Sequence, residues 1–377
     1  MTSPASSSSV LRTPLHALHA EAGARFVPFA GYEMPVQYEA GILAEHLHTR
    51  SRCSLFDVSH MGQATLIGAS HAQVAAALET LVPGDIAGLA PSQQRYTQLL
   101  TDEGTIIDDL MVTARAEDGC LALVVNAARK AVDYAHLRAH LPPEIVLETH
   151  EERALLALQG PASAQVLAQL GAQGVPDRFM TGTPGMIAGL ACVISRAGYT
   201  GEDGFEISVD AATAPALALA LLGVEPVRWA GLGARDSLRL EAGLCLYGHD
   251  IDETTSPIEA QLQWSIQKRR RVEGGFPGFQ RIRRELDEGP ARKLVAIRPE
   301  GRAPAREGTL VLSEDEAEIG KITSGGFAPS IGGPVAMGYV ASRHTAPGTP
   351  VKLLVRGTVH SARVARLPFV PHRYVKS

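Results

Sequence analysis

The chain has 377 residues, of which 45% are hydrophobic and 20% are charged, and its formal net charge is -5. This length is sufficient for two or three domains, and the composition is that of a folded globular protein rather than a disordered one. The acidic balance argues against a nucleic-acid-binding protein, and the lack of an apolar run of about 18 residues argues against a membrane span.

The cysteines and the N-terminus bear on the cellular compartment. The four cysteines are far apart and form no C-x-x-C pair, which fits reduced thiols better than a disulfide framework or a zinc site. Residues 1–12 lack the apolar core of a secretory signal and are poorer in Arg than a transit peptide. We therefore expect a short disordered lead-in at residues 1–12 and a cytoplasmic protein.

Helices and strands alternate in the first part of the chain. Thr13 and Pro14 have the order of an N-cap and a first helical position, and a second helix is expected from about Ala40. A strand is expected within residues 53–68. Ser70 is placed to cap the next helix, in which apolar residues recur at helical spacing.

Histidines in this part raise the question of a metal site. His46 and His48 form an H-x-H pair on the expected helix, and His60 lies near Asp57 in the sequence. A metal site needs three or four converging ligands, whereas an H-x-H pair on a helix points its imidazoles to different sides. We therefore expect no metal.

The stretch from Tyr96 to Thr113 predicts two strands joined by a short loop. Residues 96–100 and 106–112 favour strands, and the turn formers of residues 102–104 separate them. The second strand contains two adjacent acids, Asp108 and Asp109, although Asp is depleted in strands. Because side chains alternate along a strand, the two acids point to opposite faces.

Asp108 is the acid that we single out on this strand. It shares its face with Ile106, Leu110 and Val112, whereas the face of Asp109 is less uniformly apolar. A carboxylate against an apolar wall needs a specific partner. Asp108 is therefore a candidate functional residue, although the pattern fits equally well a structural Asp held by backbone amides or an Arg.

Asn126 ends the next expected strand, at a position where a polar amide is often only a turn residue. A further strand, a turn at Gly160-Pro161 and a helix follow it. This alternation is typical of an α+β layer.

Glu206 lies in a strand that follows the glycine-rich stretch 196–204. That stretch lacks the Lys-Ser/Thr ending of a P-loop and the context of a dinucleotide fingerprint. Phe205, Ile207 and Val209 form one face of the strand, so Glu206 points the other way. By spacing alone, we interpret Glu206 as a solvated residue.

Arg235 lies near the start of a helix that Gly243 is placed to terminate. A cation at a helix N-terminus opposes the helix dipole, which a merely solubilising charge would avoid. Arg235 is therefore a candidate to hold an anion. A salt bridge with a neighbouring acid explains the pattern equally well.

Taken together, the motifs of this chain resemble the aminomethyltransferase, or T-protein, family of the glycine cleavage system. The resemblance extends from Thr13 to Tyr374 and depends on the order and separation of the motifs. The motifs are G-Y-E-M-P-V-Q-Y, F-D-V-S-H-M, I-I-D-D-L-M-V, L-A-L-Q-G-P, G-Y-T-G-E-D-G-F-E-I, G-L-G-A-R-D-S-L-R-L-E-A-G-L-C-L-Y-G, T-S-G-G-F-A-P-S and P-F-V-P.

The resemblance implies an α+β fold with three domains in a cloverleaf-like arrangement, a central folate site and a C-terminal antiparallel β-barrel. We expect the folate-binding region, with two α+β subdomains, at residues 13–288 and the barrel at residues 289–377. The charged segment 269–289, broken by Gly and Pro, is interpreted as a linker, and the short strands beyond it fit a small barrel.

The reaction that the resemblance implies uses tetrahydrofolate as cosubstrate and the lipoylated H-protein as partner. The one-carbon unit of the aminomethyl group on the lipoyl arm passes to tetrahydrofolate. The products are 5,10-methylenetetrahydrofolate, ammonia and dihydrolipoyl H-protein. Such an enzyme acts mostly by positioning the pterin amine and by placing charge near developing cations.

The resemblance also implies roles for individual residues. Asp108 corresponds to the catalytic aspartate, which would raise the nucleophilicity of the pterin N5 amine. Glu206 corresponds to a carboxylate that binds the paired N–H donors of the pterin, which replaces its interpretation as a solvated residue. The full set of implied cofactor-binding residues is Glu206, Arg235, Trp264, Tyr374, Tyr96, Met61 and Asn126.

One motif departs from the family pattern, and the resemblance assigns no role to one basic segment. The motif that contains Tyr374 reads H-R-Y, where relatives commonly have other residues before the tyrosine. The basic run Lys268 to Arg271 is either a solvated linker or a contact for an acidic surface of the H-protein.

Other folate proteins are alternatives to the aminomethyltransferase. A flavin-linked sarcosine or dimethylglycine oxidising enzyme would need an N-terminal G-x-G-x-x-G, which this sequence lacks. A folate-dependent demethylase of another methyl donor has a similar pterin site. A folate-binding iron–sulfur assembly factor would carry Lys-Gly-Cys-Tyr-x-Gly-Gln, where this chain reads L-C-L-Y-G-H-D.

Overall fold

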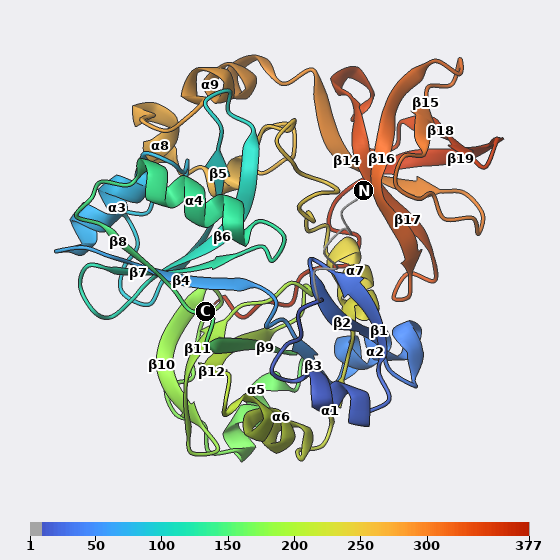
Figure 1. Ribbon diagram of the computed structural model, residues 1–377. Helices are drawn as coiled ribbons and strands as arrows, with labels where there is room; N and C mark the ends of the chain where they lie inside the picture. The colour runs from blue at the N-terminus through green and yellow to red at the C-terminus, as the bar shows by residue number, and fades with distance from the viewer. Residues whose placement is uncertain (1–9, 377) are drawn as a thin grey trace, which may run out of the picture.

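Two sheets with helices and a closed barrel form three lobes, which Figure 1 shows around a common centre. The computed structural model describes residues 10–376 of the chain. Most of the expected lead-in, residues 1–9, lies outside this range. Leu11 pairs with the backbone of Gly31 and Glu33, so the last residues of that segment run along the second strand of the chain.

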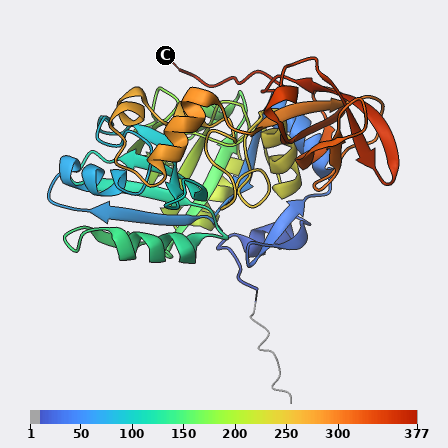
Figure 2. The same cartoon turned by 90° about the horizontal axis from the view of Figure 1, so that it is seen from above.

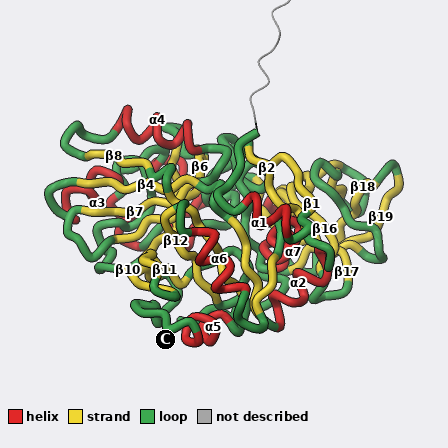
Figure 3. The backbone as a smooth tube through the Cα atoms, turned by 60° about the horizontal axis from the view of Figure 1, so that its bottom comes forward, coloured by secondary structure: helices red, strands yellow, loops and turns green. Residues whose placement is uncertain are grey.

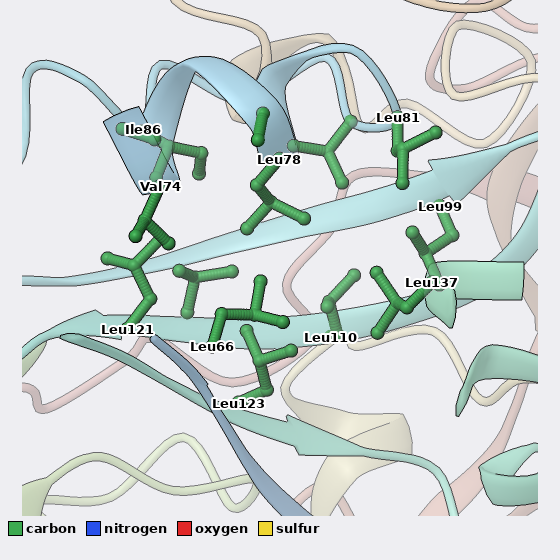
Figure 4. Packing of buried hydrophobic residues seen from close by; sticks show 14 of the residues in the cluster. Leu66, Val74, Leu78, Leu81, Ile86, Leu99, Leu110, Leu121, Leu123 and Leu137 are labelled. Atoms are coloured by element: carbon green, nitrogen blue, oxygen red, sulfur yellow. The ribbon is translucent and has the colours of Figure 1, made fainter. Parts of the chain in front are cut away.

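The first lobe is a five-stranded antiparallel sheet with the strand order β5-β6-β7-β4-β8. One of its faces packs against α3 (His71–Glu79) and α4 (Lys130–His140) through a core of aliphatic side chains that Figure 4 shows. A fully buried leucine of such a core contributes about 2 kcal/mol of hydrophobic stabilisation. The strands are β4 (Gly62–Ile67), β5 (Gln94–Leu100), β6 (Ile106–Ala114), β7 (Cys120–Val125) and β8 (Val146–Thr149).

A helix cap and a hairpin of this lobe form where the local sequence predicts them. Ser70 is the N-cap of α3 and accepts a hydrogen bond from the backbone N–H of Gln73 at 3.3 Å. The predicted hairpin is β5–β6, with Leu99 opposite Asp108 and an irregularity between Leu99 and Leu100. This irregularity moves Ile106 into a different hydrophobic cluster from Leu110, so the two do not share the face of Asp108 as predicted.

The second lobe is a six-stranded sheet with the order β10-β11-β12-β9-β3-β13, in which β13 runs parallel to β3. Its core side is covered by α1 (His16–Glu21), α5 (Ser163–Gln169) and α6 (Ala214–Leu222), and Figure 3 shows α5 and α6 against these strands. The strands are β3 (Cys53–Asp57), β9 (Arg153–Gln159), β10 (Thr181–Ile187), β11 (Leu190–Arg196), β12 (Gly204–Asp210) and β13 (Val227–Trp229).

Two N-terminal expectations are wrong in detail. The single strand expected within residues 53–68 is two strands, β3 and β4, which belong to different sheets. The chain turns between them because the Asp57 carboxylate accepts the N–H of Ser59 at 2.9 Å. Thr13 does not cap a helix, since α1 begins at His16 and the Thr13 hydroxyl donates to Asp57 at 2.6 Å.

α7 (Leu232–Glu241) joins the second lobe to the barrel. It packs against the strand β2 (Tyr32–Gln37), against α2 (Gly41–Ser51) and against the barrel strand β16 (Glu318–Ala328). β2 forms a hairpin with β1 (Arg25–Phe29). At the end of α7, Gly243 adopts a φ of 67°, which explains why the helix stops where the sequence predicted.

The third lobe is a closed barrel with the strand order β14-β17-β16-β15-β18-β19, which Figure 2 shows at one end of the molecule. Its strands are β14 (Arg292–Pro299), β15 (Leu310–Leu312), β16 (Glu318–Ala328), β17 (Gly333–Ala341), β18 (Pro350–Val355) and β19 (Thr358–Ala365). Two short 3-10 helices, η1 (Gln263–Ser265) and η2 (Ser342–His344), complete the elements. The predicted α+β class with a C-terminal antiparallel barrel is confirmed.

The interpretation of residues 269–289 as a linker is wrong. This segment contains most of α8 (Lys268–Glu273) and all of α9 (Phe279–Glu288). Arg269 lies 2.5 Å from carboxylate oxygens of both Glu79 and Asp85, and Arg270 lies 3.3 Å from Glu79. The basic run is therefore ordered because Arg269 and Arg270 bind acids of the first lobe.

The C-terminal segment returns from the barrel to the second lobe. The backbone N–H of Phe179 donates to the carbonyl of Val375 at 2.7 Å, and that of Arg373 donates to Gly201 at 2.8 Å. Within the described range, none of the helices combines the length and apolar character needed to cross a bilayer.

Candidate active site

The face of the first sheet opposite its helices carries polar and aromatic side chains. Strand register places Tyr96 opposite Met111 and Gln98 opposite Asp109 on this face. Gln94, on the same face, donates from Nε2 to the hydroxyl of Ser195 in β11 at 3.0 Å. This polar face is therefore turned toward the second sheet.

Glu206 lies on the matching face of the second sheet. It is opposite Ser195 in the register of β11 and β12, so both residues point toward the first sheet. Phe205, Ile207 and Val209 are fully buried on the other side, as the sequence predicted. The interpretation of Glu206 as a residue turned out to solvent is therefore wrong.

Glu206 and Arg235 are charged side chains that lie near each other between the two sheets. Burial raises the pKa of the Glu206 carboxyl, and the nearby charge of Arg235 opposes this effect. Burial lowers the pKa of Arg235, and Glu206 opposes this in turn. Within residues 10–376, neither side chain has a hydrogen bond or an ion pair, so both retain their capacity to bind a polar ligand.

Aromatic and imidazole groups surround Arg235. Its guanidinium lies over the ring of Tyr199, 4.6 Å from the centroid. His60 is buried, and burial together with the charge of Arg235 lowers its pKa to about 3. His60 is therefore neutral at physiological pH. Tyr199 was not a predicted site residue, because its role depends on a contact with α7 that spacing does not reveal.

Asn126 joins the two acids of β6. Its backbone N–H and its Nδ2 donate to the two carboxylate oxygens of Asp108, at 3.1 and 2.9 Å. The same Nδ2 donates to Oδ1 of Asp109 at 2.7 Å. Asn126 is therefore more than a turn residue, since its amide fixes two carboxylates that point to opposite faces of the strand.

The predicted catalytic residue, Asp108, is fully buried on the helix-covered side of the sheet. Burial raises its pKa to about 8, and the neighbouring Asp133 of α4 adds to this shift. Asp109 lies on the polar face, where burial and the charge of Asp108 raise its pKa to about 7. The alternation of the strand is as predicted, but the face of Asp109 is the one that meets the second sheet.

Tyr96 and Trp264 form an aromatic wall on the polar face. Their rings stack with centroids 5.3 Å apart and planes inclined by 21°. Ser265 of η1 donates to the Gln98 side chain at 3.1 Å, which holds this segment on β5. Trp264 remains 57% exposed, so the wall has a free aromatic surface for stacking.

Met61 and Tyr374 differ in their placement. Met61 packs against a hydrophobic cluster that contains Ala157 of the second sheet, and Val124 of the first sheet packs against the same cluster. Ala157 is paired with Glu206 in the second sheet, and Val124 is paired with Met111 in the first. It therefore lies between the two polar faces. Tyr374 stacks on Phe179 with centroids 3.9 Å apart, and within the described residues its other ring neighbour is His372.

Two open clefts are lined by residues outside the predicted site. One, of about 480 Å³, is lined by barrel residues and His249, and the other, of about 510 Å³, lies beside His136 and Pro277. Neither is lined by a predicted site residue. Among residues 10–376, no group of three His, Cys, Asp or Glu side chains is arranged to hold a metal ion.

The fold and the site define a class of two-sheet proteins with a C-terminal barrel, in which polar and aromatic side chains face one another across the sheets. Residues 15–270 match the GCVT N-terminal domain family, and residues 292–371 match the glycine cleavage T-protein C-terminal barrel domain. The chain belongs to the aminomethyltransferase, or T-protein, family of the glycine cleavage system. The predictions of this family and of an aminomethyltransferase enzyme are confirmed.

Individual relatives agree with this assignment. The chain is 47% identical to the mitochondrial aminomethyltransferase of Gallus gallus and 42% identical to that of Dictyostelium discoideum. These alignments cover 96% and 98% of this chain and 93% and 95% of the relatives. The crystal structure of the glycine cleavage system aminomethyltransferase T from Bartonella henselae superposes with a TM-score of 0.92 at 44% identity, covering 98% of this chain and 100% of that one.

The comparisons give no support to a demethylase of another methyl donor or to an iron–sulfur assembly factor. Both relatives are named mitochondrial, so the expected cytoplasmic location of this chain is not confirmed.

Proposed function

We propose that the chain transfers the one-carbon unit from aminomethyl-dihydrolipoyl H-protein to tetrahydrofolate. The products would be 5,10-methylenetetrahydrofolate, ammonia and dihydrolipoyl H-protein. The observation that carries this proposal is the pair Glu206 and Arg235, which are charged, partly buried and, within residues 10–376, without a hydrogen-bonded or ion-paired partner. A ligand with both hydrogen-bond donors and acceptors would satisfy them.

The pterin would lie between the polar faces of the two sheets. The Glu206 carboxylate accepts two hydrogen bonds from the paired N–H groups of the pterin edge, and Arg235 donates to its acceptor atoms. Trp264 and Tyr96 offer flat surfaces for stacking at distances that aromatic pairs favour. Met61 supplies an adaptable apolar wall.

The acids of β6 would act on the pterin amine. We propose that Asp109 accepts hydrogen-bond or proton density from that amine, because it faces the second sheet and its pKa is raised to about 7. Asp108, the residue that the resemblance selects, would act on Asp109 through the shared amide of Asn126. The substitutions Asp109→Asn and Asp108→Asn separate the two roles.

Tyr374 is the weakest member of the proposed site. Its stacking on Phe179 supports a role in anchoring the C-terminal segment to the second lobe. A contact with folate would require the ligand to extend to this segment.

The test is an assay of ammonia release and methylenetetrahydrofolate formation from aminomethylated H-protein. We expect both products in equal amounts, with dimethylglycine and dimethylsulfoniopropionate inactive as donors. Turnover of either control donor without turnover of the H-protein would favour the demethylase. Folate binding without any turnover would favour a binding module.

We also propose that the protein is located in a reducing compartment, and specifically in the cytoplasm. The four cysteines are free thiols in the structure, which supports the first statement. Because a mitochondrial matrix is also reducing, the cytoplasmic location requires a direct test. Imaging of the full chain fused to a fluorescent protein at its C-terminus distinguishes the two locations.

A further inference from the structure

Trp264, one half of the aromatic wall, has a largely exposed ring on a firmly packed backbone. Its ring is 57% exposed and stacks on Tyr96, with the ring centroids 5.3 Å apart. The two residues that follow it, Ser265 and Ile266, are fully buried. The direction of the indole therefore depends on how the backbone of η1 is held.

The guanidinium of Arg271 binds the backbone on both sides of Trp264. Its Nε donates to the carbonyl of Ile266 at 2.6 Å, and its Nη2 donates to the carbonyl of Gln263. Gln263 begins η1 and Ile266 follows its last residue, so the two carbonyls frame the helix. Because the donors of a guanidinium form a rigid planar fork, this contact fixes the relative orientation of the two peptide groups.

Arg271 differs in its partners from the other arginines of the basic run. Arg269 and Arg270 both pair with Glu79 of the first lobe. Within residues 10–376, Arg271 has no ion pair, and its hydrogen bonds go to the two backbone carbonyls. α8 therefore connects the first lobe to the segment that carries Trp264.

We propose that Arg271 is a positioning residue of the folate site, which holds Trp264 in the orientation that stacks on the pterin. Arg271 does not touch the ligand in this arrangement and acts through the backbone of η1. Because the wall is ordered before the ligand arrives, binding does not have to immobilise the indole. The inference rests on the proposed function, in which Trp264 belongs to the folate site.

Arg271→Met tests the role of the guanidinium, since it removes the donors and keeps an unbranched side chain. A Trp229→Phe background leaves Trp264 as the only tryptophan of the chain. Without folate, the fluorescence anisotropy of Trp264 should fall in Arg271→Met, because the indole gains motion on the nanosecond timescale.

Calorimetry and kinetics of the same variant measure the consequence for the ligand. The Kd of tetrahydrofolate should rise about threefold to tenfold, the cost of ordering one more side chain on binding. At saturating tetrahydrofolate, kcat should stay within about twofold of the parent, because the reacting groups are unchanged.

Two further variants serve as controls. Arg284 of α9 is exposed and, among the described residues, has no hydrogen bond or ion pair, so Arg284→Met removes a charge without a contact. It should leave the anisotropy and the Kd unchanged. Arg271→Lys retains the charge but lacks the planar fork, so both readouts should lie between those of Arg271→Met and the parent. This variant also replaces Arg271→Met if the latter does not fold.

The measurements separate the possible failures. If Arg271→Met matches Arg284→Met in anisotropy and Kd, the proposal is overturned even where the Tm falls, because Arg271 then acts on stability alone. A change in only one of the two readouts would also overturn it. Should the parent not bind tetrahydrofolate, the proposed function fails, and the anisotropy still decides whether Arg271 fixes Trp264.

Discussion

The side-chain amide nitrogen of Asn126 lies 2.7 Å from Oδ1 of Asp109. The same nitrogen lies 2.9 Å from Oδ1 of Asp108, so a single amide sets the relative orientation of both carboxylates. Asp108 faces the helices and Asp109 faces the second sheet. In the proposed mechanism, Asp109 is the acid that reacts and Asp108 the acid that supports it, and this geometry makes the two roles testable separately.

We predict that Asp109→Asn lowers kcat by about a hundredfold or more, while the Kd of tetrahydrofolate changes by less than about tenfold. The substitution keeps the shape of the side chain and removes its basic oxygen. Single-turnover assays with aminomethylated H-protein measure the chemical step, and calorimetry measures the affinity.

Asp108→Asn is the comparison that assigns the catalytic role. We expect it to preserve folding and folate affinity within about an order of magnitude and to lower kcat, but by less than Asp109→Asn does. If Asp108→Asn has the larger effect on kcat, the catalytic role belongs to Asp108, as the resemblance alone implies.

Glu206→Gln is predicted to weaken folate binding rather than turnover. One acceptor oxygen becomes a donor and faces an N–H of the pterin, which costs about 1–3 kcal/mol, or about a fivefold to hundredfold rise in Kd. Calorimetric titration with tetrahydrofolate measures the change, with Glu148→Gln as the control for loss of an acid elsewhere. An unchanged affinity would remove Glu206 from the site.

Local signals in the sequence were sufficient for much of the fold. The hairpin β5–β6, the cap of α3 at Ser70 and the end of α7 at Gly243 all depend on residues within one element or its turn. The alternation of side chains also separated Glu206 from the buried face of β12 correctly.

The features that the sequence did not predict depend on contacts between residues that are distant in the chain. Spacing alone does not say whether the second face of β12 meets solvent or another sheet, and the position of Ser195 beside Gln94 settles that point for Glu206. In the same way, the apolar face of β6 is the one under α3 and α4, which spacing did not distinguish from a ligand-facing wall. The charged segment 269–289 is helical because its arginines find acids that are distant in sequence.

Trp264 is predicted to report folate binding by its fluorescence. Its ring is 57% exposed and stacks on Tyr96, so a pterin that lies against it should quench or shift its emission. Trp229, the other tryptophan, packs against His19 and Tyr38 in the second lobe. Trp264→Phe should therefore abolish most of the folate-induced change, whereas Trp229→Phe should retain it. The opposite result would exclude Trp264 from the folate site.

Arg270 is predicted to act in stability rather than in docking of the H-protein. Its guanidinium is buried, lies 3.3 Å from the Glu79 carboxylate and donates to the backbone carbonyl of Glu79 at 2.5 Å. Arg270→Ala removes this ion pair and leaves the Glu79 carbonyl without its donor, while Arg269 still pairs with the Glu79 carboxylate, so the free energy of unfolding should fall by about 2 kcal/mol. Chemical denaturation measures this change.

Lys268 is the matched control on the same helix, because it is exposed and, within residues 10–376, has no ion pair. Lys268→Ala should change the free energy of unfolding by less than about 0.5 kcal/mol. Neither substitution should raise the KM for H-protein or change its dependence on salt, since Arg269 and Arg270 are already bound to Glu79 and Asp85. A salt-dependent rise in KM for Lys268→Ala, with stability intact, would instead make this end of α8 part of the H-protein contact.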